Sequence, residues 1–300
     1  MKPKMKILVV GDWQNAIVTW ACLGHIGHDV TLTHQTGGFP DGVAPTLDVH
    51  EPRLSDLVGE GTAAGRLHVF PATAGGPPGV FDAVWMAMDV PSNPDDGPDL
   101  SVLTQATEVY RGWAPRIVIS SQVPIGTCRR IQDELLTPVA YVPENMRLGD
   151  GVRTFLNADR IVVGADDQDT QTRVAEMLDG ISVASPIMRT NLATAEMIKH
   201  ATNAWLATNI SLANELAVLS EGRGVDMARV TAGLRADGRI GRRAPLVAGD
   251  GYGGTLARDV AVLANMPGAT LLKAVRDVNR ARLASRAMAV WKKERGEDKR

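Results

Sequence analysis

The residues with the clearest chemical potential lie directly after the first apolar run of the chain. Lys6–Val10 is short and apolar, and Gly11–Ala16 (GDWQNA) follows it. A glycine turn between a buried strand and a helix can bind the pyrophosphate of a dinucleotide, because the glycines permit close approach and the helix N-terminus attracts phosphate. Gly11 supplies the first glycine of the Gly-x-Gly-x-x-Gly pattern, and Ala16 is a tolerated substitute for the third.

Three residues depart from that pattern. Trp13 occupies the second glycine position, where it would crowd a pyrophosphate, and Asp12 adds a negative charge. His34 stands where the pattern has an acidic residue for the ribose 2′-hydroxyl. The loop therefore predicts a dinucleotide site, and the alternative is a Rossmann-like sheet that has lost its cofactor.

Composition excludes several classes of protein. The 300 residues carry 32 basic and 34 acidic side chains, a net charge of −2. This balance provides no strong positive electrostatic field that would attract nucleic acid or an anionic membrane. Aromatic residues make up only 4%, too few for a base-stacking platform. The length predicts about two domains. We expect no metal site.

Two cysteines do not form a disulfide framework, and they indicate a reducing compartment. Cys22 lies in an apolar helical stretch. Arg129 and Arg130 beside Cys128 could lower the pKa of its thiol, although we interpret this cysteine as structural. The apolar run after MKPKMK is too short for a signal peptide, and no run reaches the roughly 18 apolar residues of a membrane helix. We expect a cytoplasmic protein.

Alternating strands and helices must position the nucleotide loop. Short apolar runs predict strands, and stretches with helical periodicity lie between them, which is typical of a doubly wound parallel sheet covered by helices on both faces. The predicted strands are Lys6–Val10, Asp29–Thr33, Ala83–Met88, Arg116–Ser120, Val139–Val142 and Arg160–Val163. The predicted helices are Ile17–Leu23, Leu100–Arg111 and Gly126–Leu136.

The second part of the chain has a helical character. Thr194–Arg223 carries apolar residues at three- and four-residue spacing, which predicts one long helix. The glycine-rich loop Gly249–Gly254 follows, and then a predicted helix over Ala269–Trp291. We therefore expect a Rossmann-like dinucleotide-binding domain over residues 1–185 and an all-helical domain over residues 186–300.

Several segments together resemble the UDP-glucose/GDP-mannose dehydrogenase family. They are, in order, the opening βαβ region Lys6–Thr33, Glu51-Pro52 with Leu54, Val123–Thr127 (VPIGT), Pro143-Glu144 with Arg147–Gly149, Asp159–Gly164, Ala195–Glu215, Arg239–Gly241 and Gly251–Gly254. The strongest is Ala195–Glu215 (AEMIKHATNAWLATNISLANE), which is similar to the central-helix signature of that family. The resemblance covers nearly the whole chain.

The resemblance implies a function and a fold. Members of the family oxidise the primary alcohol of a nucleotide sugar to a carboxylate in two NAD-dependent hydride transfers, with a cysteine holding the intermediate as a thioester. It also implies that the long helix forms the core of a homodimer, and that the active site lies between the strand C-terminal ends and this helix.

The resemblance also assigns residues. Glu144 takes the place of the acid/base glutamate, and Lys199 that of the lysine that stabilises oxyanion charge. Asn203, one helical turn after Lys199, and Asp259, after the glycine loop, complete the set. The expected catalytic residues are Glu144, Lys199, Asn203, Asp259 and Gln122. The expected cofactor-binding residues are Gly11, Trp13, Gln14, Asn15, His34, Pro91 and Gln122, and the expected substrate-binding residues are Glu144, Lys199, Asn203, Tyr252, Gly253 and Gly254.

Each assignment has a structural alternative. Lys199 could be a surface lysine with its amine in solvent, and Glu144 a helix cap or a solvated acid. Asn203 could be a polar tie between helices, and Asp259 the cap of a following helix. The Gly251–Gly254 loop could be a bare connector.

The departures from the family pattern constrain the chemistry. With one residue deleted, the family sequence GYGGSCFPKD aligns with Gly251–Asp259 (GYGGTLARD), so Leu256 replaces the catalytic cysteine. Without a thiolate no thioester forms. The chain also ends where the third domain of the family would begin, which puts a UDP-sugar substrate in doubt.

The remaining residues suit one reversible hydride transfer. We expect a redox-neutral dehydratase or epimerase with internally recycled NAD, acting on a nucleoside or compact sugar. A two-electron alcohol dehydrogenase of a sugar nucleotide is one alternative. A non-catalytic binding protein on a degenerate dehydrogenase scaffold is another, which Trp13 and His34 motivate. We expect a small-molecule ligand and a homodimer, and no nucleic acid or membrane partner.

Overall fold

The computed structural model describes residues 4–39, 42–47, 50–71, 79–93, 97–144, 146–181 and 186–294, with side chains described as far as Met288. The chain forms two compact units, one of Met1–Pro91 and Pro98–Lys199 and the other of Ser92–Gly97 and His200–Arg300. The predicted domain boundary at residue 185 lies outside the described residues.

The first unit is built on a sheet of eight described strands in the order β3-β2-β1-β4-β5-β6-β7-β8. Their bounds are β1 Lys6–Val10, β2 Asp29–Thr33, β3 Leu67–Val69, β4 Ala83–Met86, β5 Ile117–Ile119, β6 Val139–Tyr141, β7 Ile161–Ala165 and β8 Ile187–Thr190. Neighbouring strands are parallel except β6 and β7, which are antiparallel. The expected doubly wound sheet is confirmed, with this one antiparallel pair as the exception.

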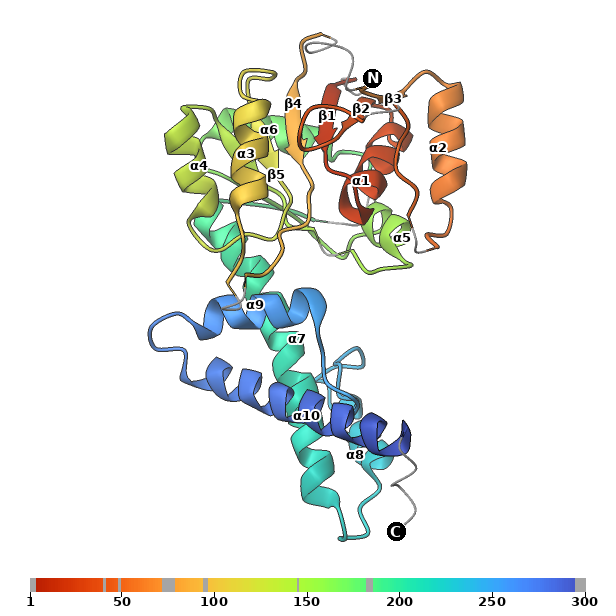
Figure 1. Ribbon diagram of the computed structural model, residues 1–300, viewed down its shortest axis with the longest axis vertical. Coiled ribbons are helices and arrows are strands. Elements are labelled where there is room, and N and C mark those ends of the chain that lie inside the picture. The colour runs from red at the N-terminus through yellow and green to blue at the C-terminus, as the bar shows by residue number, and fades with distance from the viewer. Residues whose placement is uncertain are drawn as a thin grey trace. The chain divides into compact units, whose positions relative to one another are not determined.

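Helices cover both faces of the sheet because its strands are apolar on both sides. Ile7 and Val9 of β1 face a core shared with α1 (Gln14–His25) and α6 (Gln168–Met177). Leu8 and Val10 face a second core shared with α3 (Ser101–Val109) and α4 (Thr127–Leu135). The helices α2 (Leu54–Ala63) and α5 (Gly151–Leu156) pack against α1 (Figure 1).

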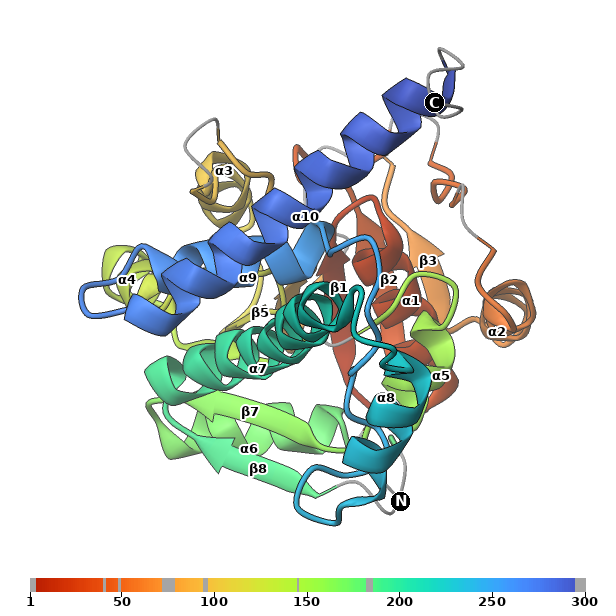
Figure 2. The same ribbon diagram turned by 90° about the horizontal axis from the view of Figure 1, so that it is seen from below.

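The structure contains elements that hydrophobic periodicity did not predict. They are the helices α2, α5, α6, α8 (Met227–Ala236) and α9 (Gly254–Ala264) and the edge strands β3 and β8. The helix α6 is largely polar, but Asp167 caps it by accepting a hydrogen bond from the backbone N–H of Thr170 at 2.7 Å. The edge strands have only three and four residues, so an alternating pattern has no room to develop. Figure 2 shows β7 and β8 side by side, with α6 packed against them.

The second unit is helical. It contains most of α7 (Leu192–Ser220), together with α8 (Met227–Ala236), α9 (Gly254–Ala264) and α10 (Thr270–Glu294). The two long predicted helices are confirmed to within three residues at each end. Apolar residues from α7, the glycine loop, α9 and α10 form the core of this unit: Ala207, Tyr252, Val260 and Val275.

Candidate active site

The nucleotide loop makes its turn at Gly11, which has a positive φ of +148°. A Cβ atom added at Gly11 would lie 2.7 Å from Cβ of Ala16 and 2.9 Å from the carbonyl oxygen of Ala87. A side chain at this position would therefore clash with backbone atoms that cannot move freely. No side chain caps the N-terminus of α1, so its first-turn N–H groups remain available to an anion. These features fit a dinucleotide pyrophosphate.

Trp13 adopts an extended backbone conformation, with φ −128° and ψ −171°, which any residue can adopt. The position therefore does not require glycine for conformational reasons. Its side chain is 44% exposed. The neighbouring Asn15 donates a hydrogen bond from Nδ2 to the carbonyl oxygen of Ser120, after β5, at 3.3 Å. Crowding of a pyrophosphate by Trp13 stays a prediction.

The end of β2 carries a polar cluster of Asp12, His34 and Gln35. Oδ2 of Asp12 lies 3.4 Å from Nε2 of His34 and accepts a hydrogen bond from Nε2 of Gln35 at 3.3 Å. Tyr110, the fully buried C-cap residue of α3, donates a hydrogen bond to the carbonyl oxygen of His34 and contacts the Thr33 hydroxyl at 3.0 Å. Burial raises the pKa of Tyr110, which keeps this hydroxyl protonated and able to donate. The position of His34 is therefore fixed from inside the unit.

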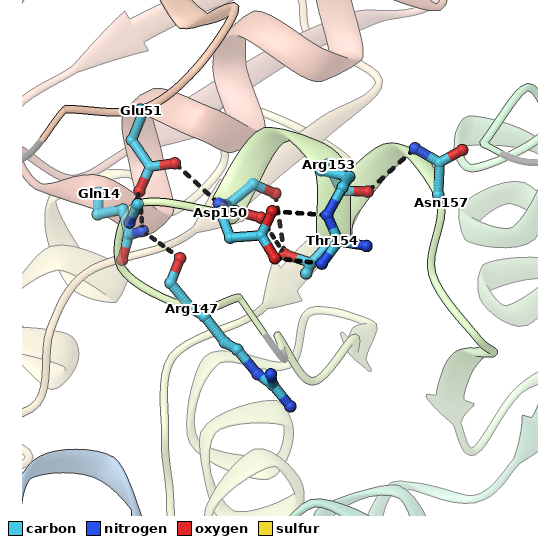
Figure 3. A network of polar contacts seen from close by, with 9 residues as sticks. Gln14, Glu51, Arg147, Asp150, Arg153, Thr154 and Asn157 are labelled. Atoms are coloured by element: carbon cyan, nitrogen blue, oxygen red, sulfur yellow. Dashed lines mark hydrogen bonds and ion pairs between the residues drawn. The ribbon is translucent and has the colours of Figure 1, made fainter. Parts of the chain in front are cut away.

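Gln14 is buried and bonded to the protein. Its Nε2 donates to Oε1 of Glu51 and, at 3.0 Å, to the carbonyl oxygen of Arg147 (Figure 3). Glu51 also accepts hydrogen bonds from the backbone N–H groups of Gly149 at 2.7 Å and Gly151 at 2.8 Å. This buried carboxylate thus joins the nucleotide loop to the segment that follows Glu144. Glu51 belongs to a segment that carries the family resemblance, and no role was predicted for it.

Five of the predicted residues follow the C-terminal ends of parallel strands in the first unit. Gly11 follows β1, His34 follows β2, Pro91 follows β4, Gln122 follows β5 and Glu144 follows β6. The carboxyl ends of parallel strands meet at one edge of the sheet, where open α/β proteins bind their ligands. The fold brings these residues to that edge.

Lys199 and Glu144 form an ion pair within the first unit. The Lys199 side chain is only 3% exposed, and its Nζ lies 3.7 Å from Oε1 of Glu144. Nζ also donates a hydrogen bond to the Glu144 carbonyl oxygen at 2.7 Å. The alternative of a surface lysine with its amine in solvent is therefore wrong. Oε2 of Glu144 accepts from the backbone N–H of Met146 at 2.8 Å, so the carboxylate is oriented from both sides.

Asp259 belongs to a buried polar cluster in the second unit. Its Oδ1 lies 2.5 Å from Nδ1 of His200, and its Oδ2 accepts a hydrogen bond from Nδ2 of Asn203. Asp259 and His200 are fully buried. The alternative of Asp259 as a helix cap is wrong, because it lies in the middle of α9. Asn203 ties α7 to α9 through this contact, and His200 was not predicted.

Side chains of α7 and α10 hold the glycine loop in the second unit. The amide of Asn279 accepts from the backbone N–H of Tyr252 at 2.9 Å and donates to its carbonyl oxygen at 2.8 Å. Oδ1 of Asn214 accepts from the backbone N–H of Gly249 at 2.7 Å, and Nε of Arg282 donates to its carbonyl oxygen at 2.7 Å. The loop is thus held in a defined conformation, unlike a bare connector. These partners lie far along the chain, and no local pattern marks them.

Leu256 occupies the first turn of α9 and packs against the apolar core of the second unit, which includes Tyr252 and Val260. Gly253 is the N-cap residue of this helix. The side chain at the position of the family cysteine is therefore engaged in apolar packing.

Both cysteines are buried and unpaired. Burial raises the pKa of the Cys22 thiol to about 12. Burial, and then the nearby carboxylate of Glu196, raise the pKa of Cys128 well above its ordinary value. The suggestion that neighbouring arginines lower it is wrong, because Arg129 pairs with Asp166 at 2.5 Å while Glu196 accepts the backbone N–H of Cys128 at 2.9 Å.

The described residues contain neither a candidate metal-binding cluster nor a candidate membrane-spanning helix. No group of three or more His, Cys, Asp or Glu side chains in the described ranges could hold a metal ion. Within the same ranges, every helix is too short or too polar to span a membrane.

Comparison with known proteins identifies the family. Residues 5–181 match the NAD binding domain of the UDP-glucose/GDP-mannose dehydrogenase family, and residues 193–281 match its central domain. UDP-glucose 6-dehydrogenase YwqF of Bacillus subtilis is 32% identical over 296 residues, 92% of this chain and 66% of that protein. UDP-glucose 6-dehydrogenase AglM of Haloferax volcanii is 33% identical over 307 residues, 92% of this chain and 69% of that protein.

A solved structure of a UDP-glucose dehydrogenase from Pyrobaculum islandicum superposes with a TM-score of 0.84 at 28% identity, covering 98% of this chain and 72% of that one. The chain spans between 56% and 69% of the length of the curated relatives compared with it. The predicted resemblance and the predicted cofactor, NAD, are confirmed. This protein, similar to the nucleotide-sugar dehydrogenases in fold and sequence, belongs to the UDP-glucose/GDP-mannose dehydrogenase family.

Proposed function

We propose that this protein uses NAD to oxidise one alcohol carbon of a sugar to a carbonyl by a single reversible hydride transfer, without continuing to the carboxylate. The substrate class is a nucleoside or a nucleotide-linked sugar, as in the relatives named above. Over the full cycle the hydride returns to the product, so the net reaction is a dehydration or an epimerisation.

The observation that carries this proposal is Leu256. The family route to the carboxylate requires a thiolate that holds the aldehyde and then the thioester. The aligned side chain here is apolar and partly buried, and it packs against the core of the second unit. The two cysteine thiols of the chain, Cys22 and Cys128, are buried and have strongly raised pKa values, so neither supplies a substitute nucleophile.

Bound NAD would accept the hydride from the alcohol carbon. Gly11 and the N-terminus of α1 would hold its pyrophosphate, and Trp13, Asn15, His34, Pro91 and Gln122 would line the rest of the cofactor site. Gln14 would act through Glu51, since its amide is already bonded within the protein.

Lys199 and Glu144 would manage the protons. A buried ammonium next to the reacting carbon stabilises negative charge on the alcohol oxygen as its proton leaves. The Glu144 carboxylate would accept that proton. Once the carbonyl has formed, the neighbouring C–H becomes acidic. The Glu144 carboxylate, after passing the first proton to solvent, would remove the proton from that carbon. A hydroxyl group that takes this proton from Glu144 as it leaves gives water and hence dehydration, whereas a proton delivered from solvent to the opposite face gives epimerisation.

The second unit would supply further contacts. We propose that Asn203 binds the substrate and that Asp259 positions Asn203 and His200, because Asp259 is fully buried. Tyr252, Gly253 and Gly254, which belong to the glycine loop, would also bind the substrate.

We further propose that residues 1–185 and 186–300 form the two domains and that the protein is located in the cytoplasm.

We also propose a homodimer formed through α7. Trp205, Leu212 and Leu219 recur every seven residues and are 52%, 45% and 56% exposed. A stripe of this period is the pattern by which two helices pack together. Light scattering after size-exclusion chromatography measures the mass directly, and Leu212→Lys should shift a dimer toward the monomer.

The deciding experiment is a mass balance. Purified protein is first denatured and its supernatant assayed for NAD(H), and the native protein is then incubated with NAD and a panel of nucleosides and nucleotide sugars. Mass spectrometry identifies products of changed mass, and NMR spectroscopy identifies an epimer, whose mass equals that of the substrate. An epimer, or the loss of one water, supports the proposal. Net NADH with a product lacking two hydrogens supports the simple dehydrogenase, and a carboxylate product with two NADH per substrate refutes the proposal.

Two variants test the assigned residues. Lys199→Ala and Glu144→Gln should each lose about 10²-fold or more in rate, the usual contribution of a general acid–base or an oxyanion-stabilising group. Lys273→Ala removes an exposed lysine of α10 and serves as the matched control. Unchanged function in Lys199→Ala favours the binding-protein alternative.

A further inference from the structure

We infer that Asp12 supplies the carboxylate that selects NAD over NADP, in place of the acidic residue that His34 replaces at the end of β2. The inference rests on the proposed use of NAD and concerns a residue that neither the sequence pattern nor the proposed mechanism assigned. It makes Asp12 a specificity-determining residue of the cofactor site.

The Asp12 carboxylate points away from the turn at Gly11 and toward the end of β2. Asp12 directly follows Gly11 in sequence, where its charge would oppose a pyrophosphate if it pointed into the turn. Instead its Oδ2 lies 3.4 Å from Nε2 of His34 and 3.3 Å from Nε2 of Gln35. Both partners directly follow β2. The carboxylate is therefore located at the end of β2, where dinucleotide-binding sheets present an acid to the adenosine ribose.

The cluster is accessible and yet fixed. The Asp12 side chain is 42% exposed and that of His34 27%, so a ligand can reach both. The backbone beneath them cannot shift easily, because the buried Tyr110 hydroxyl holds the His34 carbonyl oxygen. The His34 ring is further held by Thr36, whose Oγ1 lies 2.8 Å from Nδ1. The Asp12 carboxylate is thus held in position by its own attachment after β1 and by its contacts with His34 and Gln35 after β2.

The chemistry discriminates between the two cofactors. A carboxylate accepts hydrogen bonds from ribose hydroxyl groups, which NAD presents in full. NADP carries a phosphate on the 2′-oxygen, with a charge of about −1.5 to −2 at neutral pH. Two like charges at such short range repel each other, and the 2′-oxygen no longer offers a proton. Removing the Asp12 charge leaves Gln35 and His34, which can both donate to a phosphate.

The test is direct binding of NAD and of NADP by isothermal titration calorimetry at low ionic strength, which needs no substrate. Wild-type protein should bind NAD at least tenfold more tightly than NADP. Asp12→Asn preserves the shape and removes the charge, and it should reduce that ratio about tenfold or more, mainly by tightening NADP. Asp133→Asn removes an exposed charge of α4 and should leave the ratio within about twofold of the wild-type ratio.

The outcomes separate this inference from the proposed function. Wild-type protein that binds neither cofactor refutes the proposed function and this inference with it. Protein that binds NAD but keeps its NAD-to-NADP ratio in Asp12→Asn overturns this inference alone. An equal change in Asp133→Asn, or wild-type preference for NADP, also overturns it. A reduced ratio confined to Asp12→Asn supports it.

Discussion

Replacing Glu51 tests whether one buried carboxylate holds the nucleotide loop against the segment that follows Glu144. In Glu51→Ala, the backbone N–H groups of Gly149 and Gly151 lose their acceptor. The Gln14 amide loses one of its two acceptors and keeps the carbonyl oxygen of Arg147 (Figure 3). A hydrogen bond to a charged acceptor contributes about 1.5–3 kcal/mol, and a buried unsatisfied group costs about 1–3 kcal/mol. Water can reach the half-buried Gly149 but not Gly151. We therefore expect the free energy of unfolding of Glu51→Ala to be about 3–5 kcal/mol lower than that of the wild-type protein.

The measurement is urea unfolding followed by circular dichroism. Glu51→Gln keeps one carbonyl acceptor and should lose only about 1–2 kcal/mol. Glu60→Ala removes an exposed glutamate of α2 and should change stability by less than about 0.5 kcal/mol. A double-mutant cycle with Gln14→Ala should show coupling, because the two side chains share a hydrogen bond. A loss below about 1 kcal/mol in Glu51→Ala, or additive effects in the cycle, would refute the reasoning.

Three further predictions follow from the same geometry. Cys22 and Cys128 should not react with a thiol reagent at pH 8 in the native protein and should both react after denaturation, and a native thiol that reacts at pH 8 contradicts the burial. Because burial raises the pKa of the Cys22 thiol from 9.0 to about 12, its contribution to stability is complete below about pH 9 and is progressively lost as the pH rises toward about 12; the raised pKa of Cys128 acts in the same direction. Asp259→Ala should destabilise the protein by about 3–5 kcal/mol in urea unfolding, because His200 and Asn203 lose a buried acceptor. If this substitution lowers the stability no more than replacing an exposed aspartate by alanine does, the cluster does not stabilise the fold. Gly11→Ala should weaken NAD binding at least tenfold in calorimetry, since its Cβ would meet Ala16 and the Ala87 carbonyl, and unchanged affinity would show that the turn can relax.

The predictable part of the site was the part carried by neighbouring residues in the chain. Gly11 directly follows an apolar run and precedes a helical stretch, so its turn is visible in a window of about ten residues. The apolar spacing of Thr194–Arg223 likewise locates α7 to within three residues. Lys199 and Glu144 were assigned by resemblance, and the structure brings them together although they are 55 residues apart.

The least predictable elements and contacts were polar. The helix α6 is short of apolar residues, so periodicity gives it a weak signal even though Asp167 provides a cap. Asn279 and Asn214 look like ordinary surface residues of helices, and their role in holding the glycine loop depends on packing that no local pattern reveals. The same holds for His200, which becomes a partner of Asp259 only once α7 and α9 pack together.

The amino-acid sequence alone determined most of the alternation of strands and helices and the nucleotide turn, because both depend on residue types at short spacing, while the family resemblance located Leu256 at the position of the family cysteine. Tertiary structure alone decided where the charges lie. Glu51 meets Gly149 across 98 residues, and Asp12 turns toward His34 at the end of a neighbouring strand. A buried or half-buried charge is stable only beside a partner, and which partner it meets is set by the folding of the whole sheet.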